Sequence, residues 1–346
     1  MSEPTSDFRT LSPGFVDALE ALAERPGWWR DVLAHPDLIL AVRREAVNVY
    51  HRGASIFRIT YPNGTVTAET HTKYLLRQRQ TLVRLDMGGA FAGDPNHAVW
   101  RRYDGPQTLD EMLRAAAPLA GLEKAGLHRL LRRAPNVIDV EIALTGTTLG
   151  NSTAGNNEDN DEGTDADEAL LDGTASPPTQ RQDRLDVASL EERGGPGEAW
   201  LVFHEAKIAA NPELRAGPDR VPAIVEQVAR YTQTLTNKAD QLTAGYQALC
   251  RDLVRLDALR QRVQQATGLA ENALWHRDQL VKAVAEGTRR LRLDPQPRLV
   301  VFGFDADQRD GILGGHLRRL EAAPFHLTLR SIGNPNAGAG NAFRRR

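Results

Sequence analysis

The chain has 346 residues, of which 41% are hydrophobic and 25% are charged. This length suits two domains or one large one, and the composition is that of a globular protein. No apolar run approaches the roughly 20 residues needed to cross a bilayer, the first residues do not resemble a secretory signal, and a lone cysteine, Cys250, excludes an internal disulfide. We therefore expect a cytoplasmic protein without a membrane partner, in which Cys250 is a buried apolar side chain of a helix.

The formal net charge of −2 conceals an uneven distribution along the chain. Residues 158–172 contain eight acids and no base, so the rest of the chain carries a formal charge of +6. A mildly basic remainder allows phosphate contacts but does not demonstrate them. The segment 150–180 is rich in Gly, Asn, Ser, Thr and acids, which predicts a disordered acidic insertion. We interpret it as a solvated loop rather than as a mimic of DNA that screens a cleft.

The first 134 residues predict an α+β accessory domain for contacts with nucleic acid or a partner protein. Residues 13–46 show the apolar spacing of helices, and residues 47–70 have the pattern of short antiparallel strands joined by a hairpin turn. A capping box at 108–111 predicts a helix that begins there and continues to about Arg133.

Acids and a lysine end two apolar segments in the second half of the chain. The first segment ends at Asp186, and after a polar turn the nearly continuous apolar run 200–204 leads into Glu205-Ala206-Lys207. Side chains alternate along a strand, so Glu205 and Lys207 share one face, and an antiparallel neighbour would bring Asp186 beside them. Two carboxylates and a lysine suit binding of Mg²⁺ and activation of a water molecule. The alternative interpretation is a solvated charge pair on a sheet edge.

This pattern resembles the PD-(D/E)xK nuclease superfamily. The motif consists of Asp186 and the Glu205–Lys207 segment, followed by an expected helix in which Gln227 and Tyr231 have i, i+4 spacing. Leu185 stands where the name of the motif has a proline, a departure that is common in the superfamily.

The resemblance covers roughly residues 136–236 and implies an α/β fold of the restriction-endonuclease type. That fold is a mixed central sheet flanked by helices, expected here over residues 135–330, with a site for Mg²⁺ or Mn²⁺. The implied metal ligands are Glu141, Asp186, Glu205 and the carbonyl group of Ala206, with Asp139 less favoured than Glu141. The implied catalytic residues are Asp186, Glu205, Lys207, Gln227 and Tyr231. In this scheme the lysine orients or deprotonates the attacking water and stabilises charge on the phosphate, and the last two residues support the site from the helix.

Helical patterns dominate the rest of the chain. The expected elements are helices at about 223–249, 252–267 and 271–291 and strands at 298–304 and 325–329. Asp305 and Asp307 follow a strand and are interpreted as helix caps rather than metal ligands. Residues 331–346 are expected to be a disordered tail.

The sequence thus predicts a metal-dependent nuclease that hydrolyses phosphodiester bonds, in DNA rather than RNA, with phage defence or mobile-element biology as the implied setting. One alternative is a nuclease-like domain without activity that binds nucleic acid or protein. Another is an interaction protein in which residues 223–291 form a helical arm and the acid–lysine pattern is accidental. A homo-oligomer is compatible with each of these. The sequence contains no P-loop, dinucleotide-binding glycine motif or paired CxxC motif.

Overall fold

The computed structural model describes residues 9–75, 82–92, 100–145, 182–195, 197–217, 219–336 and 340–344. The expected acidic insertion at 150–180 lies outside these residues. The part of the chain that is described forms a mixed α/β fold with two sheets and nine α-helices. No helix within these ranges is long and apolar enough to cross a membrane.

The N-terminal sheet has six strands in chain order, each antiparallel to the next. Its strands are β1 (Ile39–Arg43), β2 (Ala46–His51), β3 (Ala54–Thr60), β4 (Thr67–His71), β5 (Leu82–Leu85) and β6 (Phe91–Ala92). Its helices are α1 (Pro13–Ala23), α2 (Trp28–Ala34) and α3 (Pro106–Ala116). The buried rings of Trp28 and Trp29 anchor α2 in the core of this half, where Trp28 lies against Phe57.

The C-terminal sheet has five strands in the order β11-β10-β9-β8-β7. Its strands are β7 (Val137–Thr145), β8 (Gln182–Glu191), β9 (Glu198–Ile208), β10 (Arg290–Phe302) and β11 (Leu329–Ile332). The first three form an antiparallel meander, whereas β10 is parallel to both β9 and β11. The sheet is therefore mixed, and the nearly continuous burial of β9 shows that both of its faces are covered.

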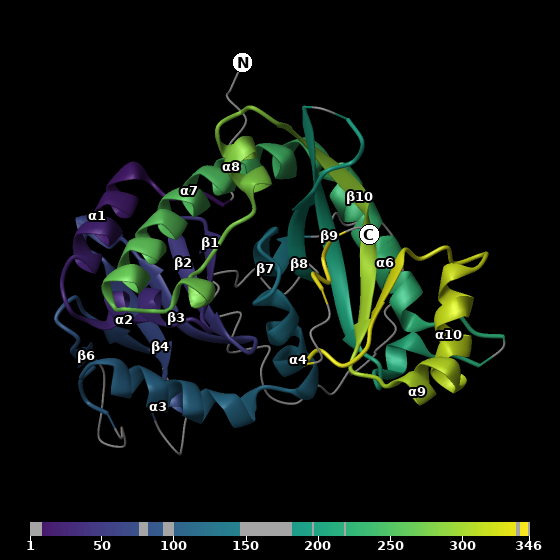
Figure 1. Ribbon diagram of the computed structural model, residues 1–346, viewed down its shortest axis with the longest axis horizontal. Coiled ribbons are helices and arrows are strands. Elements are labelled where there is room, and N and C mark those ends of the chain that lie inside the picture. Colours follow the sequence, from purple (N-terminus) through teal and green to yellow (C-terminus); the bar gives the residue numbers. More distant parts are fainter. Residues whose placement is uncertain are drawn as a thin grey trace.

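Helices connect the two sheets, which lie beside each other in Figure 1. The helix α4 (Leu122–Leu131) contacts β9, and its Leu127 belongs to a cluster that contains Tyr50 of the N-terminal sheet and Val187 of the C-terminal sheet. The remaining helices are α6 (Ala223–Asn237), α7 (Ala239–Ala266), α8 (Gln279–Ala285), α9 (Ala306–Asp310) and α10 (Ile312–Glu321). Of these, α6 contacts β8 and β10 and covers one face of the C-terminal sheet.

The long helix α7 is part of the core. It contacts α1, α2, β1 and β10, and its residues Leu242, Tyr246, Leu249 and Leu253 are buried in the main hydrophobic cluster. Cys250 on the same helix is buried as expected, and burial raises the pKa of its thiol to about 12. A helix that buries its apolar side within its own chain argues against the helical-arm alternative.

Two predicted boundaries in the N-terminal half are wrong. Residues 39–43 form β1 within a stretch expected to be helical, because all five are buried and a short continuous apolar run does not distinguish a strand from a helix. The helix expected at Thr108 begins at Pro106, a residue suited to the first turn, and ends at Ala116. The Thr108 hydroxyl instead accepts a hydrogen bond of 2.9 Å from the backbone N–H of Asp104.

The C-terminal half also differs from its prediction. The break expected near residue 250 lies at Lys238, so α7 is continuous. Of the helix expected over 271–291, only residues 279–285 are helical, as α8. The strand β10 begins at Arg290, within the range expected to be helical. Its prolines lie where the register against β9 shifts. The last strand is Leu329–Ile332 rather than 325–329. The interpretation of Asp305 is confirmed, because its side chain caps α9 in a capping box.

The described C-terminal residues are not a free tail. Phe343 is fully buried, and its carbonyl oxygen accepts hydrogen bonds from Asn136 Nδ2 (2.9 Å) and Ser189 Oγ (3.1 Å). The prediction of disorder over 331–346 is therefore wrong for residues 340–344. One aromatic side chain that packs on the sheet outweighs the Gly- and Asn-rich composition around it.

Candidate functional site

The register of the C-terminal sheet brings the predicted acids together. The register of β7 with β8 places Glu141 opposite Asp186, and the paired part of β8 and β9 ends at Val187 and His204, the neighbours of Asp186 and Glu205. The backbone N–H of Ala206 donates a hydrogen bond of 2.8 Å to Asp186 Oδ2. Glu141 has a φ of 51°, a left-handed conformation that is uncommon outside glycine and often occurs at functional positions.

A lysine that the sequence analysis did not identify joins two of these acids. Lys124 Nζ on α4 lies 2.9 and 2.8 Å from the two carboxylate oxygens of Glu141 and 3.0 Å from Asp186 Oδ1. The preceding residue, Glu123, accepts a hydrogen bond of 2.8 Å from the backbone N–H of Ile208, so α4 is fixed at the end of β9. The ammonium group of Lys124 therefore balances part of the negative charge of the cluster.

Glu205 is the most deeply buried acid of the site, with 3% of its surface exposed. Gln227 Nε2 on α6 donates hydrogen bonds to Glu205 Oε1 (3.0 Å) and to the hydroxyl oxygen of Tyr231 (2.7 Å), so the predicted Gln–Tyr pair contacts the site. The other oxygen, Glu205 Oε2, is buried and has no hydrogen-bond partner among the described residues. Burial raises the pKa of Glu205, and the charge of Asp186 raises it further, to about 8.

Lys207 is held between two acids. Its Nζ lies 3.1 Å from Glu205 Oε1 and 2.6 Å from Glu213 Oε2, and Glu213 belongs to a short 3-10 turn that follows β9. Burial alone would lower the pKa of Lys207, but Glu205 and Glu213 outweigh it and raise that pKa. The lysine is therefore cationic at neutral pH, which suits charge stabilisation rather than proton abstraction.

The three acids have the donor chemistry of a hard-cation site. Mg²⁺ and Mn²⁺ prefer oxygen ligands, and the partnerless Oε2 of Glu205 is such an oxygen. Within the described ranges, however, no three His, Cys, Asp or Glu side chains are grouped as they would be around a metal ion. Lys124 lies where Glu141 and Asp186 meet. The three acids fit a divalent cation on the condition that it displaces the ammonium group of Lys124.

Asp139, the less favoured upstream acid, has a different role. Its carboxylate lies 2.7 Å from Arg43 Nη1 and 2.8 Å from Arg9 Nη1, and it accepts a hydrogen bond of 2.8 Å from the Tyr246 hydroxyl. These partners come from the N-terminal region and α7, so Asp139 connects the two halves of the fold and is not part of the acid cluster.

Sequence reasoning did not identify Lys124 and Glu213. Lys124 lies 62 residues before Asp186, and only the packing of α4 on the sheet brings the two together. Glu213 carried a weak local signal, because Asn211-Pro212 predicts a turn that reverses the chain soon after Lys207. An acid in such a turn can fold back on a lysine at the end of the preceding strand.

The chain was compared with models of protein families, with curated proteins and with solved structures, and none of the three comparisons gave a match.

Proposed function

We propose that this protein is a metal-dependent nuclease that hydrolyses phosphodiester bonds, in DNA rather than RNA. The observation that carries the proposal is the convergence of Asp186, Glu205 and Lys207 with the Gln227–Tyr231 pair on one face of a mixed sheet. Asp186 bonds to the backbone of Ala206, and Glu205 contacts both Lys207 and Gln227. A chance match of three short sequence signals would not be expected to bring these residues so close together.

The order of the elements also supports the proposal. An antiparallel meander of β7, β8 and β9 precedes α6, and β10 then returns parallel to β9. This is the arrangement that a core of the restriction-endonuclease type requires, so we propose that fold for residues 135–330. The N-terminal half then serves as an accessory domain that fixes α4, and with it Lys124, at the site.

Lys207 is the residue that we assign to the transition state. Its two acidic neighbours hold the ammonium group in place and keep it protonated. A fixed cation beside a phosphate stabilises the negative charge that develops as the attacking oxygen approaches. Glu213 thus positions Lys207, and Gln227 positions Glu205 through a hydrogen bond to Oε1.

Glu141, Asp186, Glu205 and the Ala206 carbonyl group would hold the cation, Mg²⁺ or Mn²⁺. When bound, such a cation neutralises phosphate oxygens and lowers the pKa of a coordinated water molecule. For such a cation to bind, Lys124 would have to withdraw its ammonium group from Glu141 and Asp186. Tyr231 orients Gln227 by accepting its hydrogen bond. Phage defence or mobile-element biology is the setting that we propose by analogy alone.

The proposal is tested by incubating the protein with plasmid, linear duplex and single-stranded DNA and with RNA. Each substrate is used with Mg²⁺, with Mn²⁺ and with EDTA. We expect cleavage of DNA that needs a divalent cation and exceeds cleavage of RNA. Intact substrates under all metal conditions, with a protein shown to be folded by its melting curve, would contradict the assignment.

A nuclease-like domain without activity is the second candidate, and one observation favours it. Lys124 already neutralises Glu141 and Asp186, as a bound cation would. In that case the protein would bind DNA with the same affinity in the presence and absence of a divalent cation and would not cleave it. The substrate panel above distinguishes the two candidates.

A further inference from the structure

A large cavity lies away from the acid cluster. It has a volume of about 830 Å³ and is formed by β9, β10, β11 and the C-terminal residues. His204, the neighbour of Glu205 on β9, lines it, and adjacent residues of a strand point to opposite faces of the sheet. The cavity and the acid cluster are therefore separate sites on the two faces of the same strand.

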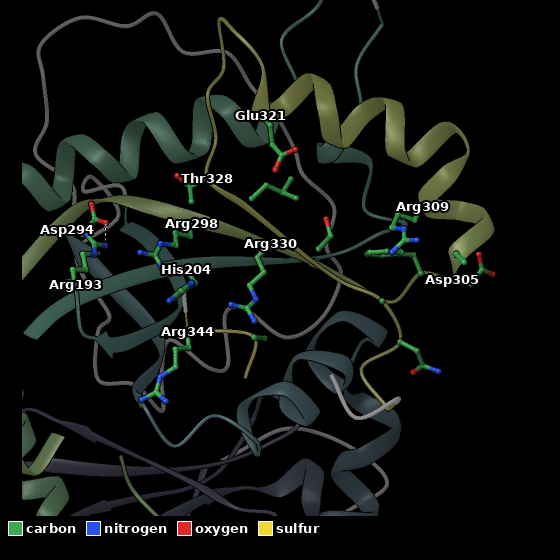
Figure 2. A pocket seen from close by; sticks show the side chains of 17 residues that line it. Arg193, His204, Asp294, Arg298, Asp305, Arg309, Glu321, Thr328, Arg330 and Arg344 are labelled. Atoms are coloured by element: carbon green, nitrogen blue, oxygen red, sulfur yellow. Dashed lines mark hydrogen bonds and ion pairs between the residues drawn. The ribbon is translucent and has the colours of Figure 1, made fainter. Parts of the chain in front are cut away.

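Arginine side chains dominate the charge of this cavity. Five of them line it, Arg193, Arg298, Arg309, Arg330 and Arg344, against the three acids Asp294, Asp305 and Glu321. Figure 2 shows Arg298, Arg330 and Arg344 around His204, with Arg193 and Asp294 at one end of the cavity and Arg309 and Asp305 at the other. Arg298 also pairs with Glu191, and Arg344 pairs with Asp278, so these guanidinium groups offer a phosphate the N–H donors that the acids leave available.

His204 has an unsatisfied atom at this centre. Its imidazole is 1% exposed, Nε2 lies 2.9 Å from Ser189 Oγ, and Nδ1 is buried without a hydrogen-bond partner among the described residues. The Ser189 hydroxyl donates its proton to the carbonyl oxygen of Phe343, so it can only accept from His204. The proton of the neutral ring is then on Nε2, and Nδ1 is an acceptor that needs a donor.

The walls beside this centre are apolar. Phe304, Leu329 and Ala342 line the same cavity. A volume of several hundred cubic ångströms with a partly apolar wall and convergent polar groups is typical of small-molecule sites.

We propose that this cavity binds a phosphorylated small molecule that carries a hydroxyl group, such as a sugar phosphate or a nucleoside monophosphate. The phosphate lies among Arg298, Arg330 and Arg344, and the hydroxyl donates a hydrogen bond to His204 Nδ1. The proposal does not depend on the nuclease assignment, because none of these side chains belongs to the acid cluster.

The test is calorimetric titration of the full chain in EDTA, which prevents metal-dependent cleavage. The probes are ribose 5-phosphate, AMP, inorganic phosphate and a short duplex DNA. We expect saturable binding of ribose 5-phosphate or AMP, at least about tenfold tighter than that of inorganic phosphate, because a buried hydrogen bond is added to the phosphate contacts. Tighter binding of AMP would identify a nucleotide as the ligand, and equal binding of both would identify a sugar phosphate.

The variant Arg330→Gln should weaken that binding by about tenfold or more, since it removes one charged donor. Arg292→Gln is the matched control, because Arg292 is on β10 outside the cavity and pairs with Glu198. In a protein labelled with ¹⁵N-histidine, the ligand should also shift the His204 Nδ1 resonance. Absence of saturable binding, equal affinity of inorganic phosphate, an unchanged affinity in Arg330→Gln, or binding of the duplex DNA alone would each overturn the proposal.

Discussion

Two adjacent residues of β9 show how differently the two faces of the C-terminal sheet are built. Glu205 is buried on the face of α6, and burial with the charge of Asp186 raises its pKa to about 8. His204 is buried on the other face, and burial with the charge of Arg298 lowers its pKa to about 3. Burial favours the neutral form of each group, so the two pKa values move in opposite directions.

The surroundings of these two residues differ in the charged side chains that they contain. On the Glu205 face, Glu141, Asp186 and Glu205 are close to Lys124 and Lys207, and one carboxylate oxygen has no partner. The His204 face carries the arginines of the cavity. We propose that the first face binds a cation and the second an anion.

Removal of Arg298, the partner of a buried acid on the His204 face, should have the largest effect on the unfolding free energy. Glu191 is 1% exposed, and Arg298 donates two hydrogen bonds to it, the longer of which is 2.7 Å. Arg298→Met leaves this buried carboxylate with Arg193 as its main partner, which should cost about 3 kcal/mol of unfolding free energy. Arg292→Met, at an exposed ion pair on the same strand, should cost less than about 1 kcal/mol. Equal losses of unfolding free energy in the two variants, measured by urea denaturation, would show that burial does not strengthen the Arg298–Glu191 pair.

A cation should stabilise the Glu205 face. Ca²⁺, which we expect to bind without supporting cleavage, should raise the unfolding free energy by about 2.7 kcal/mol at a hundredfold excess over its dissociation constant. The shift should be lost in Glu205→Gln and kept in Glu286→Gln, since Glu286 is an exposed acid at the C-terminal cap of α8. The measurement is thermal unfolding with and without Ca²⁺, and an equal shift in all three proteins would place the cation elsewhere.

The pH dependence of stability should reveal the raised pKa of Glu205. Because the folded pKa of about 8 exceeds the usual 4.5, the unfolded state releases its proton first, and this group destabilises the fold as pH rises from about 4.5 to 8. Glu205→Gln should therefore gain stability relative to wild type with increasing pH, by at most about 1.4 kcal/mol per pH unit. Denaturation between pH 5 and 9 without divalent cations tests this. A difference that is independent of pH would contradict the account.

His204 should produce the opposite slope at lower pH. Its folded pKa of about 3 is below the usual 6.5, so the unfolded state binds the proton first and stability falls as pH decreases from about 6.5 to 3. Between about pH 4.5 and 6.5, His204 and Glu205 change the unfolding free energy in opposite directions. The effect of His204 is therefore clearest below pH 4.5. His204→Gln should show a smaller loss of stability there, and denaturation between pH 3 and 6 measures it. If the variant follows the wild-type curve, His204 is not held neutral by the fold.

Local patterns predicted the strands of the site but not its counter-ions. The segment expected to end at Asp186 and the apolar run before Glu205 predicted β8 and β9, although β8 continues past Asp186 to Glu191. The i, i+4 spacing predicted the Gln227–Tyr231 contact. These signals lie within single elements. Lys124 reaches Asp186 only through the docking of α4, which no local pattern encodes.

The arginine cavity could not be predicted from local sequence patterns either. Arg298, Arg330 and Arg344 belong to two strands and the C-terminal segment, and only the sheet order and the burial of Phe343 bring them together. Composition alone predicted that this last segment would be disordered. Residues that are distant in sequence and lack a shared period could not have been grouped before the fold was known.

One rate comparison tests the role that we propose for Lys207 in phosphodiester cleavage. Lys207→Ala and the exposed-site control Lys282→Ala are assayed against wild type on linear DNA with saturating Mg²⁺ or Mn²⁺, after melting curves show that all three are folded. The account predicts a loss of cleavage rate on the order of 10²–10³ in Lys207→Ala and none in Lys282→Ala. A folded Lys207→Ala protein that cleaves at the wild-type rate would contradict it.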